Sequence, residues 1–124
     1  MSQPKTININ NNCSMPENHQ SMSRSGNSSY GMPNQAQWKN NHPTDDYEIT
    51  LLPDSSGNCS WDLSGGNPPS FTVAQGRTSA VYQLLPTAPF GMSRYQVKNL
   101  HNLSTCRESD QGRPRQDPDV IINP

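Results

Sequence analysis

The chain has 124 residues, of which 15% are charged and 29% are hydrophobic, and its formal net charge is −1. This length suits a single domain, and so small a net charge creates no field that would attract nucleic acid. No run of about 18 apolar residues occurs, so the sequence predicts no membrane span. Asn, Ser, Gln, Pro and Gly fill much of the chain, which favours a small β domain with long polar loops.

The N-terminal part is expected to contain one strand followed by a long polar loop. Apolar and polar residues alternate over Thr6–Asn10, which places Ile7 and Ile9 on one face of a strand. From about 13 to 37 the apolar content is low, and so little burial cannot offset the entropy lost on ordering the segment. We therefore expect a flexible Asn-, Ser- and Met-containing segment there.

Short alternating segments separated by turn residues follow, and they predict antiparallel strands that bury one face. Turn signals recur about every ten residues, which is typical of a β-sandwich or barrel, and no segment has a helical apolar period. The stretch 70–100 reads as a three-stranded meander, and the β-branched run near the C-terminus suggests a central strand. The expected strands are 35–41, 47–52, 59–63, 71–73, 78–84, 94–100 and 119–124.

The predicted organisation is therefore an N-terminal strand plus flexible segment, 1–34, followed by an antiparallel β-sandwich domain, 35–124. The alternation within the strands also predicts the core. The expected core residues are Ile7, Ile9, Trp38, Tyr47, Ile49, Leu51, Trp61, Leu63, Phe71, Val73, Val81, Leu84, Tyr95, Val97, Val120 and Ile122.

Several motifs follow one another in a familiar order. Trp38-Lys39-Asn40-Asn41-His42 has the form W-x-N-x-x-H, Phe71–Ser79 has the form F-x-V-x-x-G-x-x-S, and Tyr95–Val97 and Val120–Ile122 follow as later strands. In this order they resemble the strands and hairpin of the cupredoxins, over about residues 35–124. The resemblance implies a cupredoxin-like, Greek-key sandwich.

The resemblance raises the question whether this chain has the copper ligands of the family. A type 1 copper site uses two imidazoles and a thiolate, usually with an axial thioether. His42 matches the family's first ligand and Cys106 falls in the expected loop, but no His or Met follows Cys106. We therefore expect no metal or other cofactor. The alternative is an irregular copper site made of His42, Cys106, Met92 and His101.

Other candidate chemistry is weaker. Cys13, Met15, His19, Met22 and Met32 are soft donors that suit Cu(I), but their spacing follows no motif and an ordinary polar loop is favoured. No nucleophile elbow or catalytic triad is visible, so we expect a protein that is not an enzyme.

One histidine and the cysteines have ordinary structural interpretations. His42 is expected to be a loop histidine that hydrogen-bonds Asp45. Cys13, Cys59 and Cys106 lack the close spacing of a zinc site. Because no apolar leader is visible, we expect a cytoplasmic protein with free thiols, with non-classical export as the alternative. A Cys59–Cys106 disulfide is the alternative in an oxidising setting.

These observations predict a non-enzymatic β-sandwich that acts as an interaction or structural module. A polar, weakly charged surface with exposed strand edges suits a protein partner or self-association. The alternative function is copper binding by an irregular cupredoxin-like site.

Overall fold

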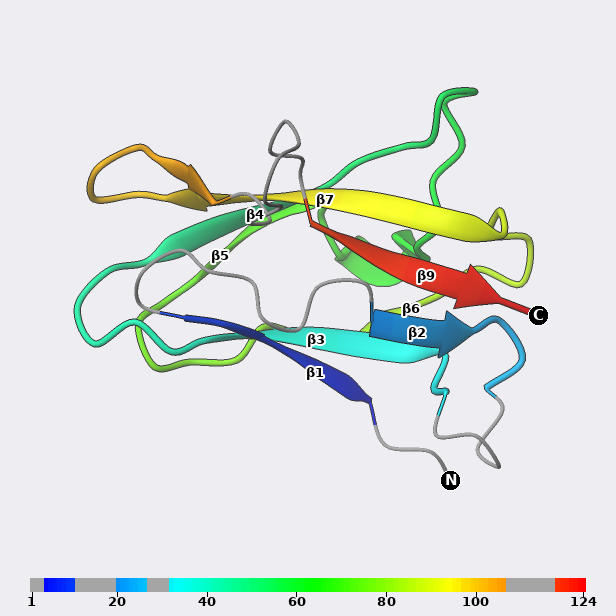
Figure 1. Cartoon of the computed structure of the whole chain (residues 1–124), viewed down its shortest axis with the longest axis horizontal. Helices are drawn as coiled ribbons and strands as arrows, with labels where there is room; N and C mark the ends of the chain where they lie inside the picture. The colour runs from blue at the N-terminus through cyan, green and yellow to red at the C-terminus, as the bar shows by residue number, and fades with distance from the viewer. Residues whose placement is uncertain (1–3, 11–19, 27–31, 107–117) are drawn as a thin grey trace, which may run out of the picture.

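The computed structural model describes residues 4–10, 20–26, 32–106 and 118–124. They form two β-sheets that pack together around one core (Figure 1). Helical structure in these ranges is limited to the short 3-10 turn η2 (Ser64–Gly66). Over the same ranges, no helix has the length and apolar content needed to cross a membrane. The predicted all-β sandwich is confirmed.

The smaller sheet has three strands in the order β1-β3-β6, formed by Lys5–Ile9, Gln35–Asn40 and Tyr82–Gln83. β1 and β3 run parallel, and β3 and β6 run antiparallel. Ile7 and Ile9 are completely buried, as their alternation with polar residues predicts.

The larger sheet contains the remaining strands, and most neighbours in it are antiparallel. They are β2 (Gln20–Ser23), β9 (Asp119–Asn123), β7 (Gly91–Asn99), β4 (Tyr47–Leu51), β5 (Ser70–Val73) and β8 (Thr105–Cys106). The path runs β2-β9-β7-β4-β5, and β8 pairs with β7 beside it. β9 therefore has a strand on each side, which confirms its predicted central position. β2 and β9 are parallel, so neither sheet is purely antiparallel.

The expected meander over 70–100 is wrong, because its three strands are divided between the two sheets. β5 pairs with β4, β6 pairs with β3 in the other sheet, and β7 pairs with β4 and β9. After β5, a turn closed by the hydrogen bond from Arg77 N to Ala74 O (2.9 Å) redirects the chain. Ser79 then hydrogen-bonds Trp38 through both its backbone N–H and its hydroxyl oxygen. These bonds hold the segment against the smaller sheet.

Two further expectations are also corrected. The segment expected to be a loop contains β2, whose Met22 is completely buried. A strand that contributes so few apolar residues leaves no readable alternation. The segment 59–63 is not a strand, since only Trp61 forms a bridge, with Leu84.

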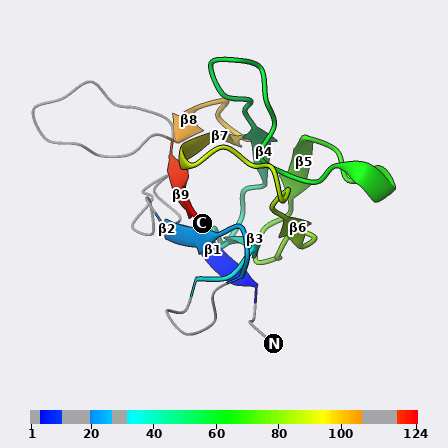
Figure 2. The same cartoon turned by 90° about the vertical axis from the view of Figure 1, so that its right-hand side faces the viewer.

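Trp38 lies at the centre of the core. Its ring is 5.4 to 6.0 Å, centroid to centroid, from four other aromatic rings: Trp61, Phe71, Tyr82 and Tyr95. These four come from a loop, β5, β6 and β7, so Trp38 joins both sheets. Figure 2 shows the same enclosure end-on, with β9 and β2 on one side of the interior and β5 and β6 on the other.

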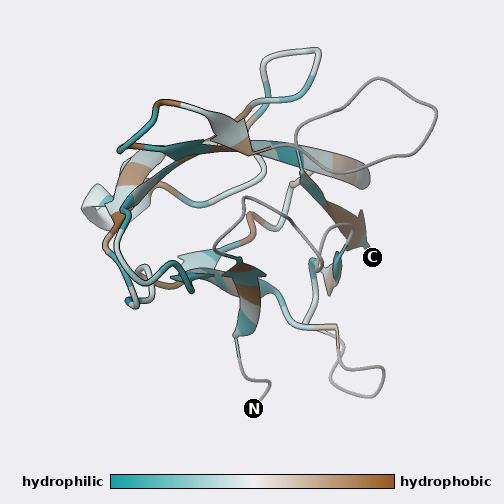
Figure 3. Cartoon of the chain, turned by 60° about the vertical axis from the view of Figure 1, so that its left-hand side comes forward, coloured by the Kyte–Doolittle hydropathy of each residue, from teal (hydrophilic) through white to brown (hydrophobic). Residues whose placement is uncertain are grey.

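Most of the predicted core is confirmed, and hydrophobic residues are concentrated in the strands around the interior (Figure 3). Leu63 and Phe71 are only partly buried. Val81 is exposed, because the strand expected over 78–84 shortens to Tyr82–Gln83. The buried hydrophobic residues that the alternation did not predict are Met22, Ala36, Tyr82, Ala88 and Cys106.

Candidate functional site

The four residues of the alternative copper site lie in different places. His42 follows β3, and His101 follows β7 at the same end of the molecule. Met92 is near the start of the nine-residue β7. At about 3.3 Å per strand residue, Met92 and His101 are on the order of 20 Å apart. The structure therefore does not bring these four side chains together.

The cysteines differ from the expected free thiols. Cys106 is buried and disulfide-bonded, so the expectation is wrong for this residue. Cys59 is free, so the alternative Cys59–Cys106 bridge does not form. The fold separates the two sulfurs, because Cys59 contacts Trp61 beside the smaller sheet whereas Cys106 pairs with Val97 in the larger one. Cys13 lies outside the described residues.

The predicted contact between His42 and Asp45 is confirmed. Nε2 of His42 lies 3.3 Å from Oδ2 of Asp45. Nδ1 accepts hydrogen bonds from the backbone N–H groups of Thr44 (3.1 Å) and Asp45 (2.9 Å), so the proton of the neutral ring belongs on Nε2. Because both ring nitrogens are engaged within the loop, neither offers a free lone pair to a metal.

Asp45 is the centre of a polar network at this end of the sandwich. Its pKa is lowered, first by the hydrogen bond from the Asn99 amide to Oδ2 (3.0 Å), and also by Thr44 and by the nearby imidazoles of His42 and His101. Asn40 donates to the backbone oxygen of Asp45 at 2.8 Å. This network fixes the loop between β3 and β4.

The described ranges contain no group of three His, Cys, Asp or Glu side chains that could hold a metal ion. Of the soft donors considered for Cu(I), Met22 is buried in the core and Met32 lies beside Asn123. Cys13, Met15 and His19 fall outside the described residues.

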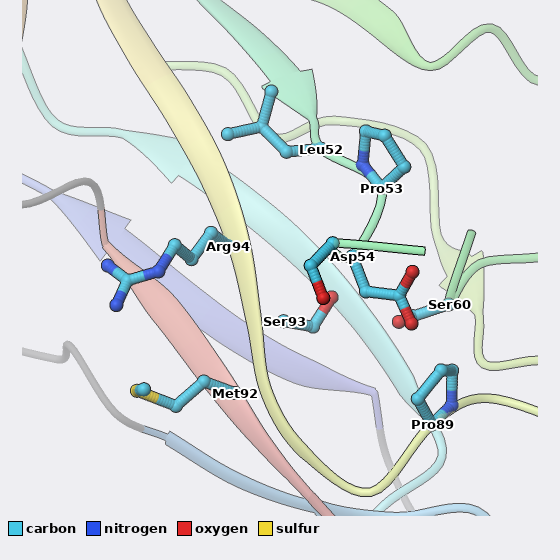
Figure 4. A pocket seen from close by; sticks show the side chains of 9 residues that line it. Leu52, Pro53, Asp54, Ser60, Pro89, Met92, Ser93 and Arg94 are labelled. Atoms are coloured by element: carbon cyan, nitrogen blue, oxygen red, sulfur yellow. The ribbon is translucent and has the colours of Figure 1, made fainter. Parts of the chain in front are cut away.

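Met92 lies at the opposite end of β7, beside a recess of about 260 Å³. Its side chain is 58% exposed. The recess forms where the chain leaves β4 and where it enters β7 (Figure 4). The residues that line it are Leu52, Pro53, Asp54, Ser55, Ser60, Pro89, Met92, Ser93 and Arg94.

The recess combines apolar walls with a few polar groups. Ser60 and Ser93 are buried, and within the described chain the hydroxyl of Ser93 has no hydrogen-bond partner. Oδ1 of Asp54 accepts hydrogen bonds from the backbone of Ser56 (2.9 Å) and Asn58 (2.8 Å), which hold the carboxylate in place. Figure 4 shows Asp54 and Ser60 on one side of β7, with Met92 and Arg94 on the other.

Phe90 adds a large apolar side chain next to this recess. It is 54% exposed, and the guanidinium of Arg24 lies 4.0 Å from the centre of its ring. Arg24 also donates a hydrogen bond to the backbone oxygen of Ala88 at 3.0 Å. The bond to Ala88 holds the guanidinium in place, and the guanidinium stacked on the exposed ring stabilises the position of that ring.

On the far side of Arg24 is a second recess of about 250 Å³, also lined by Ser25, Pro86 and Pro124. Three segments that are distant in the sequence therefore form one surface, which we call the Phe90 face. Its defining residues are Arg24, Asp54, Pro86, Pro89, Phe90 and Met92.

The Phe90 face was not predicted from the sequence, although Met92 was considered as a thioether ligand of the alternative copper site. A signal was present in the segment 86–92, where Phe90 and Met92 stand among prolines and a glycine and outside any strand alternation. Gly91 has φ +101°, a conformation that suits glycine, and it separates the two exposed side chains at the start of β7.

No protein-family model, curated protein or solved structure matches the chain. The cupredoxin resemblance therefore stays a prediction.

Proposed function

We propose that this protein is a non-enzymatic interaction module that binds a protein partner through the Phe90 face. The observation that carries the proposal is the pair of large apolar side chains, Phe90 and Met92, exposed beside a recess. Aromatic residues, Met and Arg are enriched at protein interfaces and supply much of the binding energy.

The geometry around Phe90 supports this function. Arg24 already holds the ring in one position, so a partner would lose little side-chain entropy on binding. Pro89 in the first recess and Pro86 in the second have backbone φ angles fixed by their rings, so they also add little flexibility. The face is thus preorganised for contact.

An exposed leucine away from the Phe90 face supplies a matched control. Leu103 is 65% exposed in the turn between β7 and β8, at the other end of β7. It lines neither recess of the Phe90 face. Replacing Leu103 removes a similar amount of exposed apolar surface without changing that face.

A random-peptide display library tests the proposal. Peptides selected on the wild-type protein should lose binding at least tenfold in Phe90→Ser, because the central anchor is gone, and keep it in Leu103→Ser. Their NMR shift changes should centre on Phe90 and Met92. Peptides that bind Phe90→Ser as tightly as wild type, or that map elsewhere, would show the proposal to be wrong.

A further inference from the structure

We propose that the occupant of the Phe90 face is a second copy of this chain. In the dimer, Phe90 of each protomer enters the recess bounded by Leu52, Pro53 and Pro89 of the other. This inference rests on the proposed function and names its partner.

The shape of the face suits a symmetric dimer. A twofold interface requires one patch to be complementary to itself, so that each protruding group meets a hollow on the partner. The Phe90 face carries both, because the exposed Phe90 directly follows Pro89, which lines the recess. That recess has a volume of about 260 Å³, and an entering aromatic ring would displace water from it.

The charges of the face are also complementary to themselves. Arg24 is stacked on Phe90. The recess that would receive the ring is lined by Asp54 on one side of β7 and by Arg94 on the other (Figure 4). When Phe90 enters the partner's recess, Arg24 moves with it toward the partner's Asp54, and symmetry creates this pair twice. A surface of one sign would instead suit an oppositely charged partner.

The overall charge permits this association. The net charge of −1 means that two copies repel one another only weakly, and proteins with a net charge close to zero associate more readily. Packing an aromatic ring in an apolar recess supplies the affinity, and the paired charges set the register.

Sedimentation velocity of the full chain over a wide range of concentrations tests the inference. The wild-type protein should shift from monomer to dimer as the concentration rises, and Leu103→Ser should do the same. Phe90→Ser should remain a monomer. At concentrations where the wild type is monomeric, the thermal unfolding of Phe90→Ser should match that of the wild type, because the side chain is exposed and contributes little to the core.

The charge pair has its own measurement. Asp54→Asn keeps an oxygen that can accept the Ser56 and Asn58 amide bonds but removes the charge. Its dimer dissociation constant should rise on the order of tenfold, since symmetry removes two ion pairs. The dimer of this variant should also depend less on salt than the wild-type dimer.

The outcomes separate this inference from the proposed function. A wild-type chain that stays monomeric at every concentration overturns the dimer, while peptide binding at Phe90 would still support an interaction module for a different protein. A dimer that persists in Phe90→Ser uses another surface and also overturns the inference. Salt dependence that is the same in Asp54→Asn contradicts the proposed register.

Discussion

The side-chain amide of Asn99 donates a hydrogen bond to Oδ2 of Asp45 at 3.0 Å, and this bond ties the end of β7 to the loop before β4. Asn99 is buried, and its own Oδ1 accepts bonds from the backbone N–H groups of His101 (2.8 Å) and Asn102 (3.2 Å). One asparagine therefore holds two loops together. This hydrogen-bonded loop network is expected to stabilise the folded protein. Its contribution should depend on pH because the carboxyl group of Asp45 is ionisable.

Acid should weaken this network. The pKa of Asp45 is lower in the folded protein than its value of about 3.9 in an unfolded chain. Its contribution is therefore fully present above that unfolded value and is lost as the pH falls through the lower folded pKa. Asp45→Asn should reduce the loss of unfolding free energy over this acidic range, as measured by denaturant melts. An unchanged pH profile would contradict this role.

Alkali should act through Tyr82. Burial raises the pKa of this phenol, and its hydroxyl donates a hydrogen bond to the Pro68 backbone oxygen at 2.7 Å. Stability should therefore be constant below the unfolded pKa of about 10 and should fall as the pH rises through the higher folded value. Tyr82→Phe should lose this alkaline decline while costing about 0.5–1.5 kcal/mol at neutral pH from the missing bond. Denaturant melts at neutral and alkaline pH measure both effects.

Trp38 should be among the most costly residues to replace. It is completely buried and packs against four aromatic rings from different elements. Trp38→Ala should reduce the unfolding free energy by about 3–5 kcal/mol. Phe90→Ala, in contrast, should lower it by about 1 kcal/mol or less, because Phe90 lies largely outside the core and loses only its exposed contact with Arg24. Equal losses in the two variants would be inconsistent with this core.

The two described cysteines should respond differently to replacement. Cys106→Ser removes a disulfide and should cost about 2–4 kcal/mol, whereas Cys59→Ser changes only a half-buried thiol. A reducing agent should lower the melting temperature of the wild-type protein and of Cys59→Ser, but not that of Cys106→Ser. If reduction changes none of the three melting temperatures, the disulfide does not stabilise the fold.

Only some contacts of the candidate sites could be predicted from the sequence. The contact between His42 and Asp45 was predicted because the two residues are three positions apart in one short loop. The Phe90 face was not predicted, because Arg24 and Asp54 reach Phe90 from distant parts of the chain. The separation of Met92 from His101 also follows from β7 itself, once its nine-residue length is known.

The sequence by itself determined the all-β class and most of the buried face of each strand. Alternation is a local property of an extended chain, so Ile7, Ile9 and the strand from Tyr47 to Leu51 could be read directly. Only the tertiary structure decided which strands pair, that β2 forms, and that the side chain of Phe90 lies outside the hydrophobic core. These outcomes depend on contacts such as the one between Ser79 and Trp38, whose partners are far apart in the sequence.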